Sequence, residues 1–309
     1  MLCLVAYSWY ISKMKSNRTK GIIALFILSF VFATFGIFNR YLNTNFSVFR
    51  QSYLRIFTAL LITFIVFYKD IHLKKFFSLP RKEWFIVFLR TVFLYGFAAN
   101  LNIVAFNTTT YSNVSFLGAI PTTALLGFLF LQEKVTMKKI LIIFLAFLGV
   151  LLISSRDLFH AFVWGRGQIV SIIADIFFSL MYISRKWHAD ILNNKEITFL
   201  IFVIGFFIQF GLSMIFDHHL PINGWEINYL YAIIAVSCLS VANQFLINYG
   251  FQHVKAVLAN NIIALESLFA LFIGLLIYRE IPTLQALFGG FLILLSVPLM
   301  NREEAKEKA

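Results

Sequence analysis

Residues 254–282 of this chain read VKAVLANNIIALESLFALFIGLLIYREIP, an apolar run that decides the fold. The run is long enough to cross a bilayer, because a transmembrane helix needs about 20 apolar residues. Its central acid, Glu266, lies about 12 residues, or about 18 Å, into the helix and therefore near the membrane midplane. A charge at that depth costs about 3 kcal/mol on insertion scales, so it faces a polar interior and usually marks a pathway. Glu266 is therefore the first candidate for binding a substrate or a proton.

The same pattern occurs about 147 residues earlier, where residues 107–135 read NTTTYSNVSFLGAIPTTALLGFLFLQEKV. This offset aligns Glu280 with Glu133 and Gly274 with Gly127. Both glutamates end their helices beside basic residues, and we interpret them as anchors of the following loop rather than as cavity groups. The alignment indicates an internal repeat.

Small side chains in the earlier copy form a column at i, i+4 spacing, which lets helices approach closely in lipid. The column consists of Ser115, Ala119, Thr123 and Gly127. In the second copy Glu266 replaces Ala119, while Gly274 keeps the packing position of Gly127. We therefore predict a close-packed helix face in the first copy and a face carrying a carboxylate in the second.

The composition places the chain in a membrane. Of its 309 residues 60% are hydrophobic and 13% charged, whereas soluble domains average about 45–50% and about 25%. The net charge of +12 would also suit a nucleic-acid partner, but the basic residues lie between apolar spans, as topology determinants do. Cys3 and Cys238 give neither a disulfide framework nor metal-ligand spacing, so we expect no metal and no cofactor.

The apolar segments predict an all-α polytopic membrane protein with ten transmembrane helices arranged as two inverted five-helix repeats. The approximate spans are 21–41, 46–68, 84–106, 111–132, 138–155, 167–187, 197–216, 226–249, 254–278 and 282–300. Each repeat has an odd number of spans, so the second copy enters the membrane in the opposite sense. Inverted repeats of this kind are the architecture of alternating-access carriers.

The basic residues predict the orientation. With a cytoplasmic N-terminus, about 19 Lys and Arg fall in inside segments and about five outside, a strong positive-inside bias. We therefore expect both termini in the cytoplasm of a bacterial cell, with the protein in the inner membrane. The predicted regions are a leader and basic segment (1–20), two repeats (21–155 and 166–300) and a charged tail (301–309). Translation starts either at Met1 or at Met14, which begins the basic run before the first span.

Three motifs resemble the EamA family of the drug/metabolite transporter superfamily. They are YLRIFTALLITF (53–64), FLFLQEKVT (128–136) and ALESLFALFIGLLIYREIPT (264–283), and the resemblance covers about residues 20–300. It implies a ten-helix secondary carrier with a central cavity. The second half of family members often carries Glu-Pro where this chain has Glu266-Ser267, so no proline supplies a helix break here.

Two further charges lie within spans, Asp175 and Arg55, each about eight residues, or about 12 Å, from the predicted outer end. Equal depth favours an ion pair between them, with Arg55–Glu266 as the alternative. Arg55 is also suited to holding a substrate carboxylate in a bidentate fork, and Asp175 to facing either a substrate or a water-filled vestibule. Arg90 lies about two turns from the predicted inner end, where we expect it to snorkel to the surface.

Amides within the spans are expected mostly to bond neighbouring helices. They are Asn100, Asn102, Gln209, Asn243, Gln244, Asn248, Asn260 and Asn261. Asn243 and Gln244 lie in mid-span and are the strongest pair for substrate contact, and Asn100 is a further candidate.

No catalytic motif of a hydrolase, metalloprotease or nucleotide-binding enzyme is present in the sequence. We predict a secondary active transporter of small metabolites, amino-acid-like or cationic and amphipathic, that works by alternating access and couples to protons or to exchange. The alternative is a non-transporting membrane subunit or a lipid-handling partner. The expected partners are the substrate, the bilayer and a coupling proton, but no nucleic acid, and the chain is a monomer or a homodimer.

Overall fold

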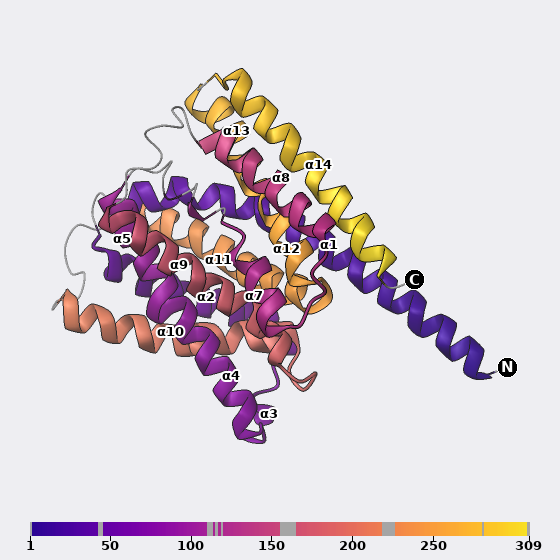
Figure 1. The fold of residues 1–309 in the computed structure, drawn as a ribbon. Helices are drawn as coiled ribbons and strands as arrows, with labels where there is room; N and C mark the ends of the chain where they lie inside the picture. The colour runs from indigo at the N-terminus through magenta and orange to yellow at the C-terminus, as the bar shows by residue number, and fades with distance from the viewer. Residues whose placement is uncertain are drawn as a thin grey trace.

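The computed structural model describes residues 2–42, 46–109, 114, 117–118, 120–154, 165–217, 226–279 and 281–307 (Figure 1). Regular secondary structure within these ranges is helical throughout. Nine helical segments of the described chain are long and apolar enough to cross a membrane, which confirms the predicted all-α membrane class. The remaining predicted span, 111–132, lies partly outside the described residues, so the count of ten stays a prediction.

The described helices fall into two halves, one ending at residue 154 and one starting at residue 165. The first half contains α1 (Leu2–Leu42), α2 (Val48–Phe67), η1 (Tyr68–Asp70), α3 (Leu73–Phe77), α4 (Arg81–Thr91), the π-helix η2 (Val92–Ala98), α5 (Ala99–Thr108), α7 (Thr122–Phe130) and α8 (Met137–Ser154). The second half contains α9 (Arg166–Ile183), η3 (Ser184–Trp187), α10 (Asn194–Phe216), α11 (Ile227–His253), α12 (Ala256–Ile263), α13 (Leu265–Tyr278) and α14 (Leu284–Lys306).

Two of the spans are interrupted in mid-membrane. The third span changes from α4 to the π-helix η2 and back to α5, and π turns occur frequently at functional sites. The ninth span is divided at Ala264, where Ser267 N donates to Ala264 O at 3.2 Å in a tighter, 3₁₀-type bond. The interruption therefore forms two residues before Glu266 without the proline that family members often carry. In the first half, α7 begins at Thr122, directly after Pro121.

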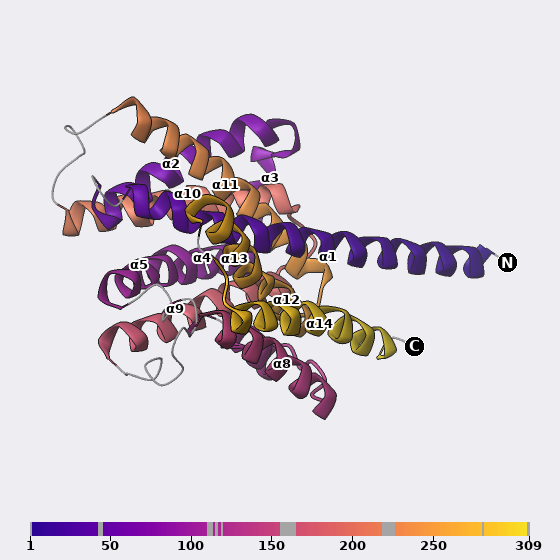
Figure 2. The same ribbon diagram turned by 90° about the horizontal axis from the view of Figure 1, so that it is seen from above.

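Contacts between the halves bind the bundle together. The first helix, α1, packs along α11, and α2 packs on both α10 and α11 (Figure 2). The last helix of each half, α8 and α14, run side by side in both ribbon views. Their backbones touch at two glycines, since a Cβ on Gly149 would lie 2.6 Å from the carbonyl oxygen of Gly289. Small residues at such a crossing allow the close approach that stabilises helix pairs in lipid.

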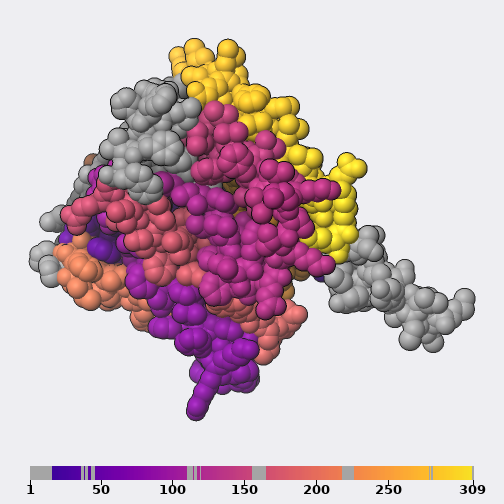
Figure 3. Space-filling model, viewed as in Figure 1, coloured from indigo at the N-terminus to yellow at the C-terminus, as the bar shows by residue number. Residues whose placement is uncertain are grey.

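The outer surface of the bundle is apolar, as a lipid-facing surface must be. Figure 3 shows the atoms of α8 and α14 adjoining on one face. Large apolar side chains are exposed on both helices, among them Phe144, Phe288, Phe291 and Leu294. In water such a surface would be an aggregation hazard, whereas in a bilayer it is the expected exterior.

Candidate functional site

Asp175 lies on α9 at the contact between the two halves. The hydroxyl of Thr122 donates to its carboxylate, and Thr122 and Ser179 are joined by a 2.7 Å hydrogen bond. Thr123, the small residue predicted to pack closely, is also 2.7 Å from Ser179. Because α7 starts at Thr122, both threonine side chains project from its first turn toward α9. A hydroxyl ladder therefore fixes one side of Asp175 and leaves the rest of the carboxylate half-buried.

Glu266 stands in the first turn of α13, where the positive end of the helix dipole favours a negative charge. Its charge acts on Asp175 and on the buried Tyr182, so the three groups share one region of the interior. Among the described residues no hydrogen bond or ion pair engages the Glu266 carboxylate, and the side chain is half-buried rather than closed off. We call Asp175 and Glu266 the acidic pair.

Arg55 lies in a second polar cluster. Its guanidinium is 5.7 Å from the centre of the Phe35 ring, and its charge interacts with the side chain of Tyr95. The carbonyl oxygen of Tyr95 accepts hydrogen bonds from Asn100 at 2.7 Å and from Gln209 at 2.8 Å. A π turn displaces the regular ladder of the helix, and here two amide side chains satisfy the displaced carbonyl. Asn100 thus stabilises the π turn through its hydrogen bond to the Tyr95 carbonyl oxygen.

The predicted ion pair between Arg55 and Asp175 is wrong: within the described chain the carboxylate of Asp175 accepts a hydrogen bond from Thr122 and forms no ion pair with Arg55. The reason lies in helix adjacency. Arg55 is on α2, which packs on α10 and α11, whereas Asp175 is on α9, which packs on α5, η2 and α7. Two residues at equal predicted depth can therefore lie on helices that have different neighbours in the same bundle.

The π-helix η2 links the helix of Asp175, α9, to α10, which packs on the helix of Arg55. It packs against α9 on one side and against α10 on the other. Phe97 of η2 stacks on Phe177 of α9 with ring centres 4.5 Å apart, and the Tyr95 ring is so close to α10 that only glycine fits at position 205. This aromatic-rich element thus touches the helix that carries Asp175 and, through Tyr95, reaches the region of Arg55.

The predicted amide pair occupies the middle of α11. Gln244 is buried and its Nε2 has no hydrogen-bond partner in the described chain, and the same holds for Oδ1 of Asn243. Asn261 on α12, which the sequence placed among the structural amides, is fully buried with both polar atoms unpartnered there. Buried amides normally find partners, so Asn243 and Gln244 stay candidates for contact with a polar substrate, and Asn261 joins them.

The predicted packing column is only partly described, since Ser115 and Ala119 lie outside the described residues. Gly127 packs on α12, where an added Cβ would come within 2.8 Å of the Cβ of Ala256. Gly274 lies half-buried on α13.

Glu133, predicted to anchor a loop of its own half, instead caps a helix of the other half. Its carboxylate oxygens accept from the backbone N–H groups of Ala256 at 2.7 Å and Val257 at 3.2 Å. Gln132, with φ 53°, turns the chain so that Glu133 points across. Glu304 accepts from the next N–H, that of Leu258, at 3.2 Å. Two carboxylates therefore satisfy the first turn of α12, as helix N-termini favour. Glu280 lies outside the described residues.

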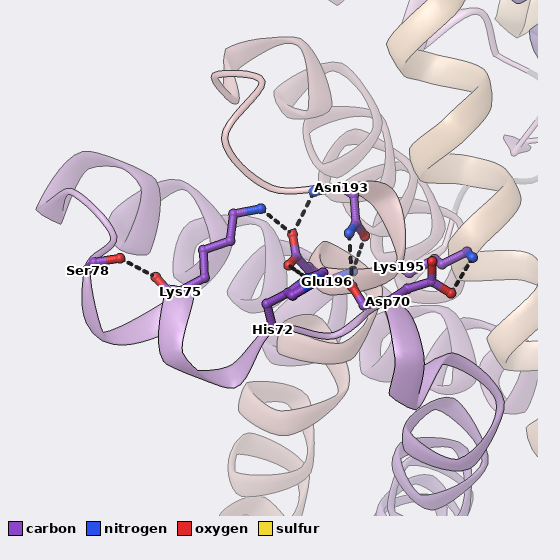
Figure 4. A network of polar contacts seen from close by, with 7 residues as sticks. All are labelled: Asp70, His72, Lys75, Ser78, Asn193, Lys195 and Glu196. Atoms are coloured by element: carbon purple, nitrogen blue, oxygen red, sulfur yellow. Dashed lines mark hydrogen bonds and ion pairs between the residues drawn. The ribbon is translucent and has the colours of Figure 1, made fainter.

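A second network joins the halves at the predicted cytoplasmic end (Figure 4). Glu196 at the start of α10 is 2.8 Å from Lys75 and 3.2 Å from His72, both of the linker between the second and third spans. Lys195 pairs with Asp70 of the same linker at 2.6 Å. Asn193 and Glu196 also form a capping box, so the start of α10 is fixed both within its helix and from across the interface.

The sequence missed several of these groups because their signals are local. Thr122 follows Pro121 directly, Thr123 was predicted only as a packing residue and not as a hydrogen-bonding one, and Tyr95 precedes Gly96 in a largely apolar span. Each pattern is common in membrane helices, and only the neighbouring helix makes it part of a polar wall.

The helical architecture and the apolar exterior define a multi-pass membrane protein. The chain belongs to the EamA-like transporter family, whose model matches residues 19–155 and again residues 165–302. An uncharacterized transporter of Synechocystis sp., sll1164, is 25% identical over 267 residues, covering 81% of this chain and 75% of that protein. A solved crystal structure shares the fold with a TM-score of 0.78 at 9% identity, covering 94% of this chain and 99% of that one.

Proposed function

We propose that this protein is a secondary active transporter that moves a small amino-acid-like metabolite across a bacterial inner membrane. The observation that carries the proposal is that half-buried charges of both signs lie within the spans: the acidic pair, Asp175 and Glu266, and Arg55 on a different helix. Intramembrane charges of both signs are costly and mark substrate or ion pathways. A zwitterion has an ammonium group, which would bind the acidic pair, and a carboxylate, which would bind Arg55.

The acidic pair and Arg55 suit different groups of such a substrate. The carboxylates suit an ammonium group, while the planar fork of Arg55 suits a carboxylate held by two parallel hydrogen bonds. Phe177, which is on the same helix as Asp175, and Phe97 stack into an aromatic surface that suits an apolar side chain. This arrangement favours an amphipathic amino acid over a sugar or a nucleotide. The acidic pair would also carry the coupling proton, since two neighbouring carboxylates ionise one after the other.

The polar contacts at the predicted inner end support alternating access. Glu133 with α12 and Glu196 with Lys75 both tie one half to the other there. Because each contact crosses between the halves, a transporter that opens inward must release them. We infer that the described arrangement is closed at this end. During the cycle these contacts would break while contacts at the outer end form.

Contacts near the termini support an even number of spans. Arg18, before the first span, donates to Asn301 at 2.7 Å and lies 3.9 Å from Glu304 at the end of α14. This contact supports the proposal that the first and last spans begin and end on the same side, as an even number of crossings requires. The positive-inside rule favours the cytoplasm as that side.

The test is transport in proteoliposomes that contain the purified full-length chain. Counterflow with a panel of labelled amino acids should reveal the substrate. Asp175→Asn should then raise KM for zwitterions but spare analogues that lack the ammonium group. Arg55→Gln should raise KM for zwitterions but spare analogues that lack the carboxylate. If both variants lose transport of all analogues equally, the acidic pair and Arg55 do not bind separate groups of the substrate. Failure of the wild type to move any solute would favour a non-transporting subunit.

A further inference from the structure

Arg90 on α4 is the largest fully buried side chain of the described residues, with no exposed surface. The prediction that it snorkels to the membrane surface is wrong, because it lies on the face of α4 that points into the bundle. Its neighbours on that face, Val87 and Thr91, are buried as completely. The guanidinium donates from Nη2 to Oδ1 of Asn248 at 2.8 Å and from Nε to the carbonyl oxygen of Met181 at 3.4 Å.

These partners leave the guanidinium incompletely satisfied. The Nη1 group of Arg90 is buried and has no hydrogen-bond partner among the described residues. Asn248 is neutral, and its own amide nitrogen is committed to Thr198 at 2.9 Å. Buried charges are normally paired or coordinated, yet no described carboxylate lies within ion-pair distance of Arg90.

The surrounding charges make this position more electropositive, not less. Arg185, which bonds to Asn194, adds a second cation whose charge acts on Arg90. Glu83 lies seven residues before Arg90 on the same helix, about 10 Å along the axis. Its carboxylate is already engaged at 2.8 Å by both His188 and the N–H of Ala189.

His188, which is neutral, neither balances nor adds to the positive charge. Burial lowers the pKa of the His188 imidazole, and the charges of Arg90 and Arg185 lower it further, so the ring is neutral at physiological pH. The carboxyl-terminal end of α9, which includes Met181, contributes about half a negative charge as a helix dipole. That partial charge is shared between two arginines and offsets neither completely.

We infer that Arg90 Nη1 binds a small monovalent anion, with chloride as the abundant representative, at the junction of α4, α9 and α11. Such an ion would accept from the unpartnered N–H groups and balance the guanidinium charge. The two hydrogen-bond partners of Arg90 and its two neighbours on the same helix face are all fully buried, which favours a small anion over a phosphate or an organic carboxylate. The site joins the first half, through α4, to the second half, through α9 and α11, and so would stabilise the bundle independently of the transported substrate.

The test is the thermal stability of the purified full-length protein in detergent, measured by intrinsic fluorescence. Sodium chloride is titrated against sodium gluconate at constant ionic strength, so that screening does not change. An ion that binds only the folded protein raises Tm in a saturable manner, and we expect a rise of about 2–4 °C. The Arg90→Gln variant should lose this chloride dependence. The control Lys82→Gln, which removes an exposed cation from the same helix, should keep it.

Equal Tm values for the wild type in chloride and in gluconate would overturn the proposal and favour water at Nη1. A chloride effect that persists in Arg90→Gln would place the ion elsewhere and overturn it as well. If Arg90→Gln does not fold, crystals of the wild type grown in bromide decide the question. An anomalous peak within hydrogen-bond distance of Nη1 is the expected result, and a clean map at that position would refute the assignment.

Discussion

The cap that Glu133 places on α12 offers the sharpest test of how the halves are held together. Glu133→Ala removes both carboxylate bonds, to Ala256 N at 2.7 Å and Val257 N at 3.2 Å. Hydrogen bonds to a charged group contribute about 1.5–3 kcal/mol each when buried. Glu133 is only half-buried, so water replaces part of the loss and we expect a total of about 2–3 kcal/mol. Glu133→Gln keeps one acceptor and should lose about half as much.

This loss has two measurable consequences. At about 2–4 °C per kcal/mol, Glu133→Ala should lower Tm in detergent by about 4–12 °C. If the contact forms only in the inner-closed arrangement, the same energy shifts the balance toward the inward-open one by about 30-fold or more. A single cysteine in place of the buried Val257 should then react at least about tenfold faster with a maleimide applied from the inner side.

The control is Lys134→Gln, which changes an exposed neighbour of Glu133 that contributes only its backbone carbonyl to the network. It should leave both Tm and the labelling rate close to those of the parent. The reasoning fails if Glu133→Ala matches that control in both assays, because the cap would then carry no net energy. A fall in Tm without faster labelling would keep the cap as a structural contact and remove it from the transport cycle.

Three further predictions address coupling, packing and topology. Glu266→Gln should abolish gradient-driven accumulation but spare substrate exchange in proteoliposomes, because an amide keeps the shape and cannot release a proton; unchanged accumulation would exclude Glu266 from coupling. Gly205→Ala should lower stability by about 1–3 kcal/mol, since its Cβ would come within 2.5 Å of the Tyr95 ring, and a Tm equal to wild type would show that the ring moves freely. In a background without native cysteines, an impermeant maleimide applied from outside should label a cysteine at His160 but not one at Lys75, and the opposite result would invert the topology.

The residue order was enough to predict the membrane class of the protein and an expected depth for each of its intramembrane charges. Hydrocarbon thickness fixes the length of a span, so the apolar runs alone predict the membrane helices. Counting residues from a span end then gives the depth of Glu266, Asp175 and Arg55, because the helix rise is constant. The offset between residues 107–135 and 254–282 revealed the repeat, and the family match in both halves agrees with it.

Only the tertiary structure decided which charges meet. Depth is a single coordinate, whereas a contact also requires the right rotation of each helix about its axis and the right neighbour. Arg55 and Asp175 share a depth but lie on helices with different partners, and Arg90 points inward where a small rotation would have taken it to lipid. Glu133 reaches across to α12 because of one left-handed residue, Gln132, at the end of α7. Packing sets these directions, since each helix turns whichever face fits its neighbours, and that choice is made by the whole bundle rather than by any one segment.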